Sequence, residues 1–393
     1  MSSFEYVALN ATLMCLVALS IDLVLPALGM MAQDLKITSD NHRQLVITAL
    51  FVGLAIGQLG YGPLSDSYGR KPAIIFGSAI FCVGCLGAAT ATTLEGMLVG
   101  RVVQGLGAAG PRIVAVAMIR DRYQGAEMAR IMSLIMGVFI FVPMFAPALG
   151  QLLLVVMPWR ALFLVTLAIG IVGVLWLTIR QAETLVDPVP FNVTRLVASA
   201  REFFRSRVSV WFTIAGAFAY GALMGFVNSS QQIFQDLYGA GSSYVVLFGG
   251  TAACTAVSVF ANSVLVQRVA PELICKRAVQ FQLAVAIVFV AATVAVSGRL
   301  PLYVAYGFIC LTLLSLGLTF GNFAAIALKP LGHIAGTAAA LNATLSTALS
   351  LTVAAAIGQA FDGTVMPLAV GFCICGFASL IAMARAKVLP ANG

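Results

Sequence analysis

Apolar residues recur along the chain in blocks of roughly 20, and short polar turns separate these blocks. A helix needs about 20 apolar residues to cross the roughly 30 Å core of a bilayer. The strands of a membrane β-barrel would instead show alternating segments of about 10 residues, and the sequence lacks that pattern. We therefore predict twelve membrane-spanning helices, at residues 7–31, 43–64, 72–92, 95–119, 129–153, 160–180, 208–229, 243–266, 278–297, 301–328, 334–357 and 364–386.

The composition supports this prediction. Hydrophobic residues make up 61% of the 393 residues and charged residues 9%, with a mean hydropathy of +1.02, whereas soluble proteins carry about 25% charged residues. The first apolar block lacks the basic segment and the small-residue cleavage site of a signal peptide, so we expect it to stay in the protein. The predicted fold class is an all-α integral membrane protein.

The basic residues predict the orientation of the spans. If both termini are cytoplasmic, 16 of the 22 Lys and Arg lie on the inner side, as the positive-inside rule expects. Four lie outside, and Arg101 and Arg112 lie within a span. These cations are spread over short turns, so the net charge of +8 does not indicate nucleic-acid binding. The inner cations are Arg70, Lys71, Arg120, Arg122, Arg130, Arg180, Arg195, Arg201, Arg205, Arg207, Arg268, Lys276, Arg277, Lys329, Arg385 and Lys387.

The longest loop divides the spans into six and six. We predict an N-terminal six-helix bundle at 1–180, a cytoplasmic basic linker at 181–207 and a C-terminal six-helix bundle at 208–393. Transporters built from two repeated bundles with a central binding site have this layout. Residues 194–207 form either an amphipathic helix on the inner membrane surface or a plain basic linker.

Of the 14 acidic residues, Asp22 alone lies inside a predicted span. It is about 13 Å from the outer end of its helix. A charge at that depth costs several kcal/mol unless the carboxyl holds a proton. Asp22 is therefore a candidate for taking up and releasing a proton as its surroundings alternate between dry and wet. The alternative is a structural aspartate that hydrogen-bonds a neighbouring helix.

Two arginines lie in the fourth predicted span. Eleven residues at 100° each place Arg101 and Arg112 within about 20° of one another around the helix, with Gln104 near the same stripe. An arginine at such depth should face the protein interior or an aqueous cavity. Arg101 either modulates the proton affinity of Asp22 or packs helices by binding carbonyl groups. Arg112 either meets an anionic group on a substrate or satisfies buried carbonyls.

Other spans carry uncharged polar residues, among them Asn228 and Asn342, which either line a cavity or form interhelical hydrogen bonds. The pairs Gly53/Gly57 and Gly317/Gly321 predict close helix contacts. Pro143 and Pro147 should bend the fifth span or free its carbonyls.

No metal site is expected, because the pair Cys82 and Cys85 has no accompanying histidine. His42 and His333 fall in opposite loops, which argues against an enzyme.

The turn between the second and third spans reads GPLSDSYGRKP. We expect Gly62 and Gly69 to provide close approach and a tight bend. Asp66 is expected to accept hydrogen bonds from the start of the next span or an adjacent helix. Arg70 and Lys71 hold the turn inside and can pair with acids, forming a conformational latch that breaks when the bundles move. The alternative is that they anchor the topology alone.

This turn resembles the loop 2–3 signature of the major facilitator superfamily. RVVQGLGAA from Arg101 resembles the proton-coupling motif of its drug:proton antiporters, and APALGQ, with Pro147 and Gly150, resembles their antiporter motif. SIDLVLPAL around Asp22, IRDRY from residue 119 and GHIAGTA from residue 332 are similar to the bicyclomycin/chloramphenicol-resistance subfamily. Some relatives carry a second acid two turns before Asp22, where this chain has Met14.

The resemblance implies a twelve-helix exporter of small lipophilic molecules or drugs, driven by inward proton movement, in the inner (cytoplasmic) membrane. Its expected partners are a small-molecule substrate, protons and the lipid bilayer, with no cofactor, and it is expected to be a monomer. Met14 and Arg112 leave room for neutral or anionic substrates, so an exporter of an endogenous anionic metabolite, such as a carboxylate siderophore, is the alternative. A channel or a non-transporting scaffold is a third reading, which no charge ring or filter-like segment supports.

Overall fold

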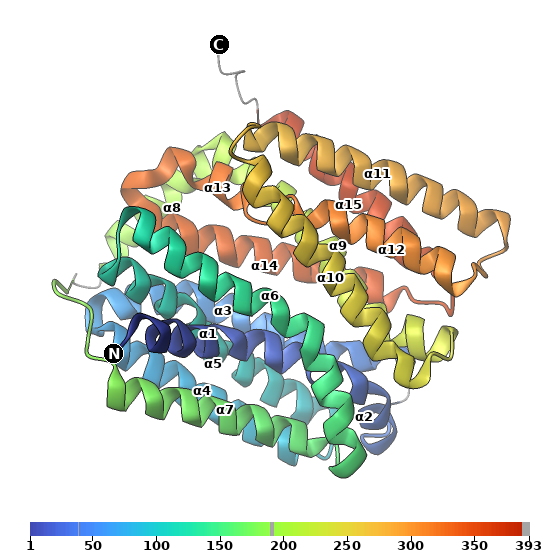
Figure 1. Cartoon of the computed structure of the whole chain (residues 1–393), viewed down its shortest axis with the longest axis horizontal. Helices are drawn as coiled ribbons and strands as arrows, with labels where there is room; N and C mark the ends of the chain where they lie inside the picture. The colour runs from blue at the N-terminus through green and yellow to red at the C-terminus, as the bar shows by residue number, and fades with distance from the viewer. Residues whose placement is uncertain (38, 189–191, 387–393) are drawn as a thin grey trace. The chain divides into compact units, whose positions relative to one another are not determined.

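The computed structural model describes residues 1–37, 39–188 and 192–386, so Lys387, one of the predicted inner cations, lies outside the described residues. Within these ranges all regular elements are helices and there are no strands, which confirms the all-α prediction (Figure 1). Eleven described stretches are long and apolar enough to cross a membrane. One of them, Leu302–Gln359, has 58 residues and contains both predicted spans 301–328 and 334–357.

The chain divides into two compact units, Met1–Asn192 and Val193–Gly393, called unit 1 and unit 2 below. Unit 1 contains α1 (Ser3–Asp22), a 3-10 turn (Leu25–Ala27), α2 (Leu28–Asp34), a second 3-10 turn (Asp40–Gln44), α3 (Leu45–Tyr68), α4 (Arg70–Thr90), α5 (Leu94–Arg122), α6 (Gly125–Val156) and α7 (Arg160–Arg180). In this unit α5 packs against α3, α4 and α1, and α1 also packs against α6 and α7.

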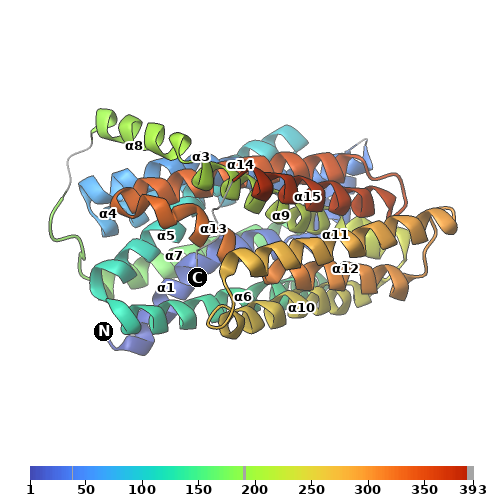
Figure 2. The same cartoon turned by 90° about the horizontal axis from the view of Figure 1, so that it is seen from above.

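Unit 2 begins with α8 (Val193–Arg205) and α9 (Arg207–Gln231), followed by a π-helical turn (Gln232–Leu237) and a 3-10 turn (Gly241–Ser243). It continues with α10 (Tyr244–Leu265), α11 (Pro271–Ala295), α12 (Leu302–Gly317), α13 (Asn322–Leu328), a 3-10 segment (Lys329–Ile334), α14 (Ala335–Gln359) and α15 (Met366–Arg385). Figure 2 shows α11 and α12 side by side, and α10 also packs against α12.

Pairs of helices approach closely at some glycines, as the sequence predicted for Gly53. A Cβ on Gly53 would lie 1.9 Å from the carbonyl oxygen of Val102, so α3 and α5 can only meet there without a side chain. In unit 2 a Cβ on Gly317 would lie 1.9 Å from the Ser258 hydroxyl oxygen. The expectation for Gly321 is wrong: α12 has already ended, and no described atom lies within 4 Å of its Cβ position.

The predicted linker contains a helix. α8 spans Val193–Arg205 and packs on α9 and α14. Its Phe203 is buried beside Leu331 and Ala338, and the Glu202 carboxylate lies 2.6 Å from Nε2 of His333. Residues 193–205 therefore form a helix, not an irregular linker, and this helix packs on unit 2.

Candidate functional site

The first membrane span is not one continuous helix. α1 ends at Asp22, the chain makes a 3-10 turn at Leu25–Ala27, and α2 then continues to Asp34. Pro26 contributes to the break because it has no backbone N–H to donate to the preceding turn. Interrupted membrane helices leave backbone groups free and recur at the binding sites of transporters. The predicted proton-coupling residue therefore lies at the point where its helix breaks.

The Asp22 side chain is 5% exposed, and within the described part of the chain no group hydrogen-bonds or ion-pairs with its carboxyl. The structure thus gives no support for the alternative of a structural aspartate bound to a neighbouring helix. Met14, where relatives can carry a second acid, is buried with Tyr6, Ile119 and Ile135 in an apolar cluster. Met14 is therefore part of the hydrophobic core, whereas the last residue of α1 is an unpaired carboxyl within the described structure.

The helix that carries the antiporter-like motif presses against this break. A Cβ on Gly150 of α6 would lie 2.2 Å from the carbonyl oxygen of Leu23, the residue after Asp22. Any side chain at position 150 would therefore push α6 away from the end of α1. α6 runs unbroken through Pro143 and Pro147 and bends along its course (Figure 1), as expected for two prolines inside one helix.

Arg101 is completely buried inside unit 1. Its Nε donates to the Val46 carbonyl at 2.9 Å, its Nη1 donates to Gln104 Oε1 at 2.6 Å, and its guanidinium carbon lies 5.7 Å from the centre of the Phe163 ring. Its Nη2 has no hydrogen-bond partner among the described residues. In this conformation Arg101 ties helices together through a carbonyl, as the alternative prediction stated, and it does not hydrogen-bond Asp22.

A polar chain nevertheless links Arg101 to the helix of Asp22. Gln104, which accepts from Arg101, donates through Nε2 to the Ser20 hydroxyl at 3.3 Å and to the Cys85 sulfur at 3.1 Å. Ser20 lies two residues before Asp22 and itself donates to the carbonyl of Leu16. A displacement of α5 relative to α1 would therefore disturb the hydrogen bond to Ser20, two residues before Asp22.

Arg112 has a different environment from Arg101 although both project from the same side of α5. Arg112 is half-buried, and across the described ranges its guanidinium has no hydrogen bond or ion pair. Eleven residues along the helix separate the two groups by about 16 Å. Arg112 can thus still bind an anion, whereas two of the three side-chain nitrogens of Arg101 already donate hydrogen bonds within the protein.

Asn228 and Asn342, predicted either to line a cavity or to form interhelical hydrogen bonds, belong to unit 2 and are both largely buried. Asn342 Oδ1 accepts a hydrogen bond from the Thr213 hydroxyl at 2.8 Å, which joins α14 to α9. Asn228 is 2% exposed and makes no side-chain hydrogen bond within the described ranges. The interhelical alternative therefore applies to the Asn342 oxygen, and Asn228 keeps its amide free.

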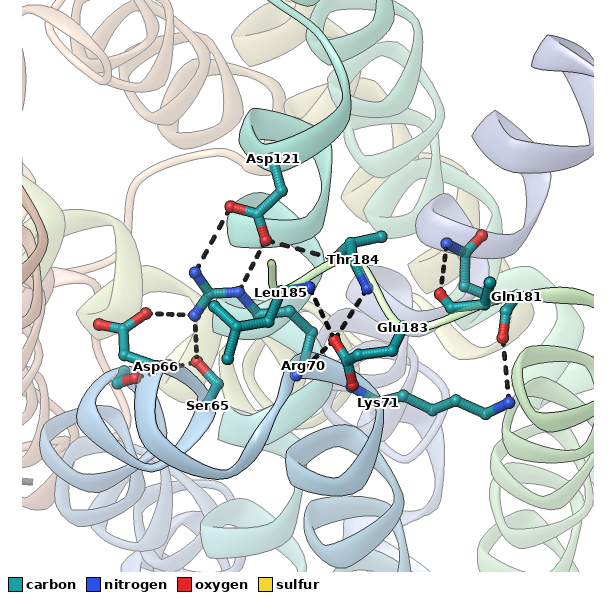
Figure 3. A network of polar contacts seen from close by, with 11 residues as sticks. Ser65, Asp66, Arg70, Lys71, Asp121, Gln181, Glu183, Thr184 and Leu185 are labelled. Atoms are coloured by element: carbon teal, nitrogen blue, oxygen red, sulfur yellow. Dashed lines mark hydrogen bonds and ion pairs between the residues drawn. The ribbon is translucent and has the colours of Figure 1, made fainter. Parts of the chain in front are cut away.

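Figure 3 shows the polar network around the junction of α3 and α4. Arg70 Nε donates to Asp121 Oδ2 at 2.8 Å, and its Nη1 donates to the Ser65 hydroxyl at 2.9 Å and to the Asp66 carboxylate. Lys71 Nζ donates to the carbonyls of Thr178 and Gln181 at 2.7 and 3.0 Å. The predicted pairing of these cations with acids is confirmed for Arg70, whereas Lys71 caps carbonyls near the end of α7.

The expected tight bend at Gly69 is confirmed, whereas the expected close approach at Gly62 is wrong. α3 continues to Tyr68 and α4 begins at Arg70, so Gly69 alone forms the junction, with φ of +105°. Gly62 lies inside α3, and nothing in the described structure comes within 4 Å of its Cβ position, so it provides no close approach. Asp66 accepts from the side chain of Arg70, the first residue of α4, as the sequence predicted. The backbone amides at the start of α4 are bound by a different residue.

That residue is Glu183, which sequence reasoning missed. Its carboxylate accepts from the backbone amides of Arg70 and Lys71 at 2.9 and 3.0 Å, and from those of Thr184 and Leu185 at 2.8 and 3.0 Å (Figure 3). Burial raises the pKa of the Glu183 carboxyl, but these hydrogen bonds outweigh burial and hold the pKa below its usual value. The only sequence signal was an acid three residues after the end of α7, on the same predicted side as the turn.

Gly69 makes this cap possible. A Cβ at position 69 would lie 2.7 Å from Oε2 of Glu183, and the positive φ is itself unfavourable for any residue with a side chain. The positive end of the α4 dipole adds an attraction for the carboxylate. One network therefore joins the ends of α3, α4 and α5 to the segment after α7.

Comparison with known proteins identifies the family. The sequence matches the model of the Major Facilitator Superfamily over residues 11–355. The chain belongs to the major facilitator superfamily. It is accordingly a multi-pass membrane transporter and not an enzyme.

Related proteins share modest sequence identity with this transporter. An uncharacterized MFS-type transporter, YdgK of Bacillus subtilis, is 28% identical over 348 residues, covering 86% of this chain and 85% of the relative. A bicyclomycin resistance protein homolog of Haemophilus influenzae is 26% identical, covering 61% and 60%. Multidrug resistance protein MdtL of Salmonella paratyphi C is 29% identical, covering 66% and 65%. The chain thus spans less than two thirds of the length of the last two.

Solved structures show the same fold. The xylose transporter XylE from E. coli, in a partially occluded inward-open conformation, has a TM-score of 0.74 at 11% identity, covering 99% of this chain and 98% of the other. The human organic anion transporter MFSD10 has a TM-score of 0.66 at 14% identity, covering 98% and 100%. At these identities the likeness concerns the fold of the transporter and not its cargo.

Proposed function

We propose that this transporter is a proton-coupled exporter of small lipophilic molecules, including drugs, that works by alternating access. The observation that carries the proposal is Asp22, a buried carboxyl without a partner among the described residues, placed where its membrane helix breaks. The names of the Haemophilus and Salmonella relatives, both of which refer to resistance, support a drug as cargo. The proton gradient is the driving force, and no cofactor is required.

The proposed cycle uses Asp22 as the proton carrier. With the cavity open to the cytoplasm, a lipophilic molecule enters and Asp22 releases its proton inward. After the transporter opens outward, Asp22 takes up a proton from outside and the molecule leaves. Each charge that moves inward across 100 mV supplies about 2.3 kcal/mol. That energy supports a gradient of roughly 50-fold for a neutral substrate per proton.

The break after Asp22 makes this cycle physically reasonable. The regular helix ends beside the carboxyl, and the chain turns at Leu23 and Val24, whose amides donate to the carbonyls of Leu19 and Ile21 at 3.2 and 3.3 Å. The proposed cycle requires that water reach the carboxyl at this turn when the transporter changes state. The contact between Gly150 and the Leu23 carbonyl couples this point to the movement of α6.

The network at the α3–α4 junction is the proposed conformational latch. In the proposed topology both termini are cytoplasmic, so this network lies on the inner side of the inner (cytoplasmic) membrane. Arg70 holds Asp66 and Asp121, and Glu183 holds the start of α4. The latch stabilises the helix ends of unit 1 in one arrangement, and its breakage would accompany the change of state.

Transport by Asp22 variants in proteoliposomes tests the proposal. Under an imposed pH gradient we expect Asp22→Asn to lose uphill drug transport, because the amide cannot carry a proton, and Asp22→Glu to retain part of it. Asp34→Asn is the matched control, since Asp34 also lies in the first span but pairs with Arg160 and Trp159 at its end. Full proton-driven transport by a well-folded Asp22→Asn protein would refute the assignment.

A second candidate cargo is an endogenous anionic metabolite, such as a carboxylate siderophore. Arg112 favours it, because this half-buried guanidinium has no partner in the described structure. An anionic cargo requires that Arg112→Gln lose transport while neutral drugs are unaffected. If Arg112→Gln instead leaves metabolite secretion by cells unchanged, the anionic candidate is excluded.

A further inference from the structure

Unit 2 carries a large surplus of positive charge that unit 1 does not have. Residues 1–192 contain 11 Lys and Arg against 10 Asp and Glu, a net charge of +1. Residues 193–393 contain 11 Lys and Arg against 4 Asp and Glu, a net charge of +7. Most cations of unit 2 therefore cannot be neutralised by acids of the same unit and must find anions elsewhere.

Three of these cations gather at the junction of α10 and α11, namely Arg268, Lys276 and Arg277. All three are exposed, and none has a side-chain hydrogen bond or ion pair within the part of the chain that the structure describes. Glu272 is the acid of this junction, and it lies on the same side of α11 as Lys276 but about 140° around the helix from Arg277, which keeps the surplus charge. The junction therefore presents unneutralised positive charge at the end of two membrane helices.

An apolar groove of about 300 Å³ adjoins this charge. Leu265 at the end of α10, Leu273 and Phe281 of α11, and Leu318 after α12 contribute to its walls, and Arg277 is its only charged lining residue. The groove is not a polar substrate site, because its one other polar side chain, Ser315, donates its hydroxyl to the carbonyl of Thr312 at 2.6 Å.

The groove and the cation have the arrangement of a lipid site. Leu273, Arg277 and Phe281 follow one another at intervals of four residues, so they line one side of α11 over about 12 Å. Helical side chains lean toward the N-terminus of their helix, which for Arg277 means toward the α10–α11 junction. Its charge can therefore reach the membrane surface while its stem covers the groove.

We propose that this groove binds an anionic phospholipid, with an acyl chain against the apolar walls and the headgroup phosphate on Arg277. Arg268 and Lys276 add to the attraction, since each cation near the surface of an anionic leaflet contributes about 1 kcal/mol. In the proposed topology the lipid belongs to the inner leaflet. A neutral lipophilic occupant would fill the groove but would leave the unpaired cations of the junction unexplained.

Lipid retention measured by native mass spectrometry tests this site without any transport assay. The intact protein is released from nanodiscs that contain equal amounts of phosphatidylglycerol and phosphatidylcholine with identical chains. We expect wild type to retain phosphatidylglycerol at least about fivefold more than phosphatidylcholine. Arg277→Gln should lower this ratio several-fold, with Arg268 and Lys276 keeping a residual preference, and Arg277→Lys should restore most of it because the charge returns.

Two further variants make the result specific. Arg299→Gln removes an equally exposed cation near the opposite end of α11 and should leave the ratio unchanged. Ala278→Phe places a ring in the groove and should reduce retention of both lipids. The proposal is overturned if wild type shows no preference, if Arg277→Gln keeps the wild-type ratio, or if Ala278→Phe retains both lipids fully.

Discussion

The junction between the second and third spans of unit 1 can be compared with the corresponding junction of unit 2. The two differ in whether their cations have partners inside the protein. Both join antiparallel membrane helices and both carry a pair of adjacent cations, Arg70 and Lys71 in one and Lys276 and Arg277 in the other. In unit 1 every one of these charges has partners inside the protein. In unit 2 neither has a partner within the described residues, and an apolar groove lies beside Arg277.

The difference separates a basic turn that is bound within the fold from one that, as we propose, binds the membrane. In unit 1 the Arg70 guanidinium donates hydrogen bonds to two carboxylates and a hydroxyl. The turn therefore joins helix ends, as the proposed latch requires. In unit 2 acids are scarce, so the positive charge remains available to lipid phosphate. The same sequence rule, that cations gather on the inner side, therefore covers two physical roles that only the partners distinguish.

Arg70→Gln should have the largest effect on the latch. It leaves Asp121 and Asp66 without their cation, and the loss of a largely buried partner destabilises by about 3 kcal/mol. We expect a clear fall in the thermal midpoint in detergent and a loss of transport. A wild-type midpoint for Arg70→Gln would contradict the view that this junction is held by internal ion pairs.

Gly69→Ala should have the next largest effect. The new Cβ meets the Glu183 carboxylate at a backbone conformation that only glycine adopts easily, and we expect a loss of about 2 kcal/mol. Gly62→Ala is the matched control in the same motif. It lies inside α3 with open space around it, so it should gain up to about 1 kcal/mol in thermal stability. Equal effects at the two glycines would disprove the assigned geometry.

Glu183→Gln should have a smaller effect that depends on pH. The pKa of the Glu183 carboxyl is lower in the folded protein than in the unfolded chain, so the unfolded chain binds the proton more tightly. The stabilisation is therefore present at neutral pH and is lost as the pH falls through the folded-state pKa. Because Glu183 is exposed, we expect only about 1 kcal/mol at pH 7.

Thermal midpoints of wild type and Glu183→Gln across the acidic range provide the measurement. The advantage of wild type should shrink as the pH falls and should be largest near neutrality. A difference that stays constant with pH would show that the carboxylate charge does not hold the start of α4.

Arg277→Gln should have the smallest effect on the protein alone. Because this cation has no partner among the described residues, its loss in lipid-free detergent should change the stability by less than about 0.5 kcal/mol. Added phosphatidylglycerol should raise the midpoint of wild type more than that of the variant. A large loss in the absence of lipid would mean that Arg277 serves the fold, as Arg70 does.

The sequence predicted the long apolar helices because a stretch that crosses a bilayer must be hydrophobic along its length. It located Asp22 because a lone acid in an apolar block is conspicuous. It did not predict that α1 ends at Asp22, although Pro26 was a signal, because one proline does not specify where the preceding helix stops. The length of α3 was also missed, since Pro63 and Gly62 suggested an earlier end than Tyr68.

Partner choices were the least predictable feature. Arg101 and Arg112 have the same angular position on α5, yet one is buried against Val46 and Phe163 and the other is unpaired. Glu183 was missed because its partners at the start of α4 are backbone amides more than a hundred residues away, and every residue except proline has such an amide. Such contacts depend on how helices pack, which periodicity alone does not determine.

The central claim, that Asp22 exchanges a proton for substrate, can be measured directly in detergent solution. A pH-sensitive dye in weak buffer near neutral pH reports protons released when a transported drug is added to the purified protein. We predict that wild type releases protons on drug binding and that Asp22→Asn binds the drug without release. Equal proton release from both proteins, or drug binding by wild type without any release, would contradict the account.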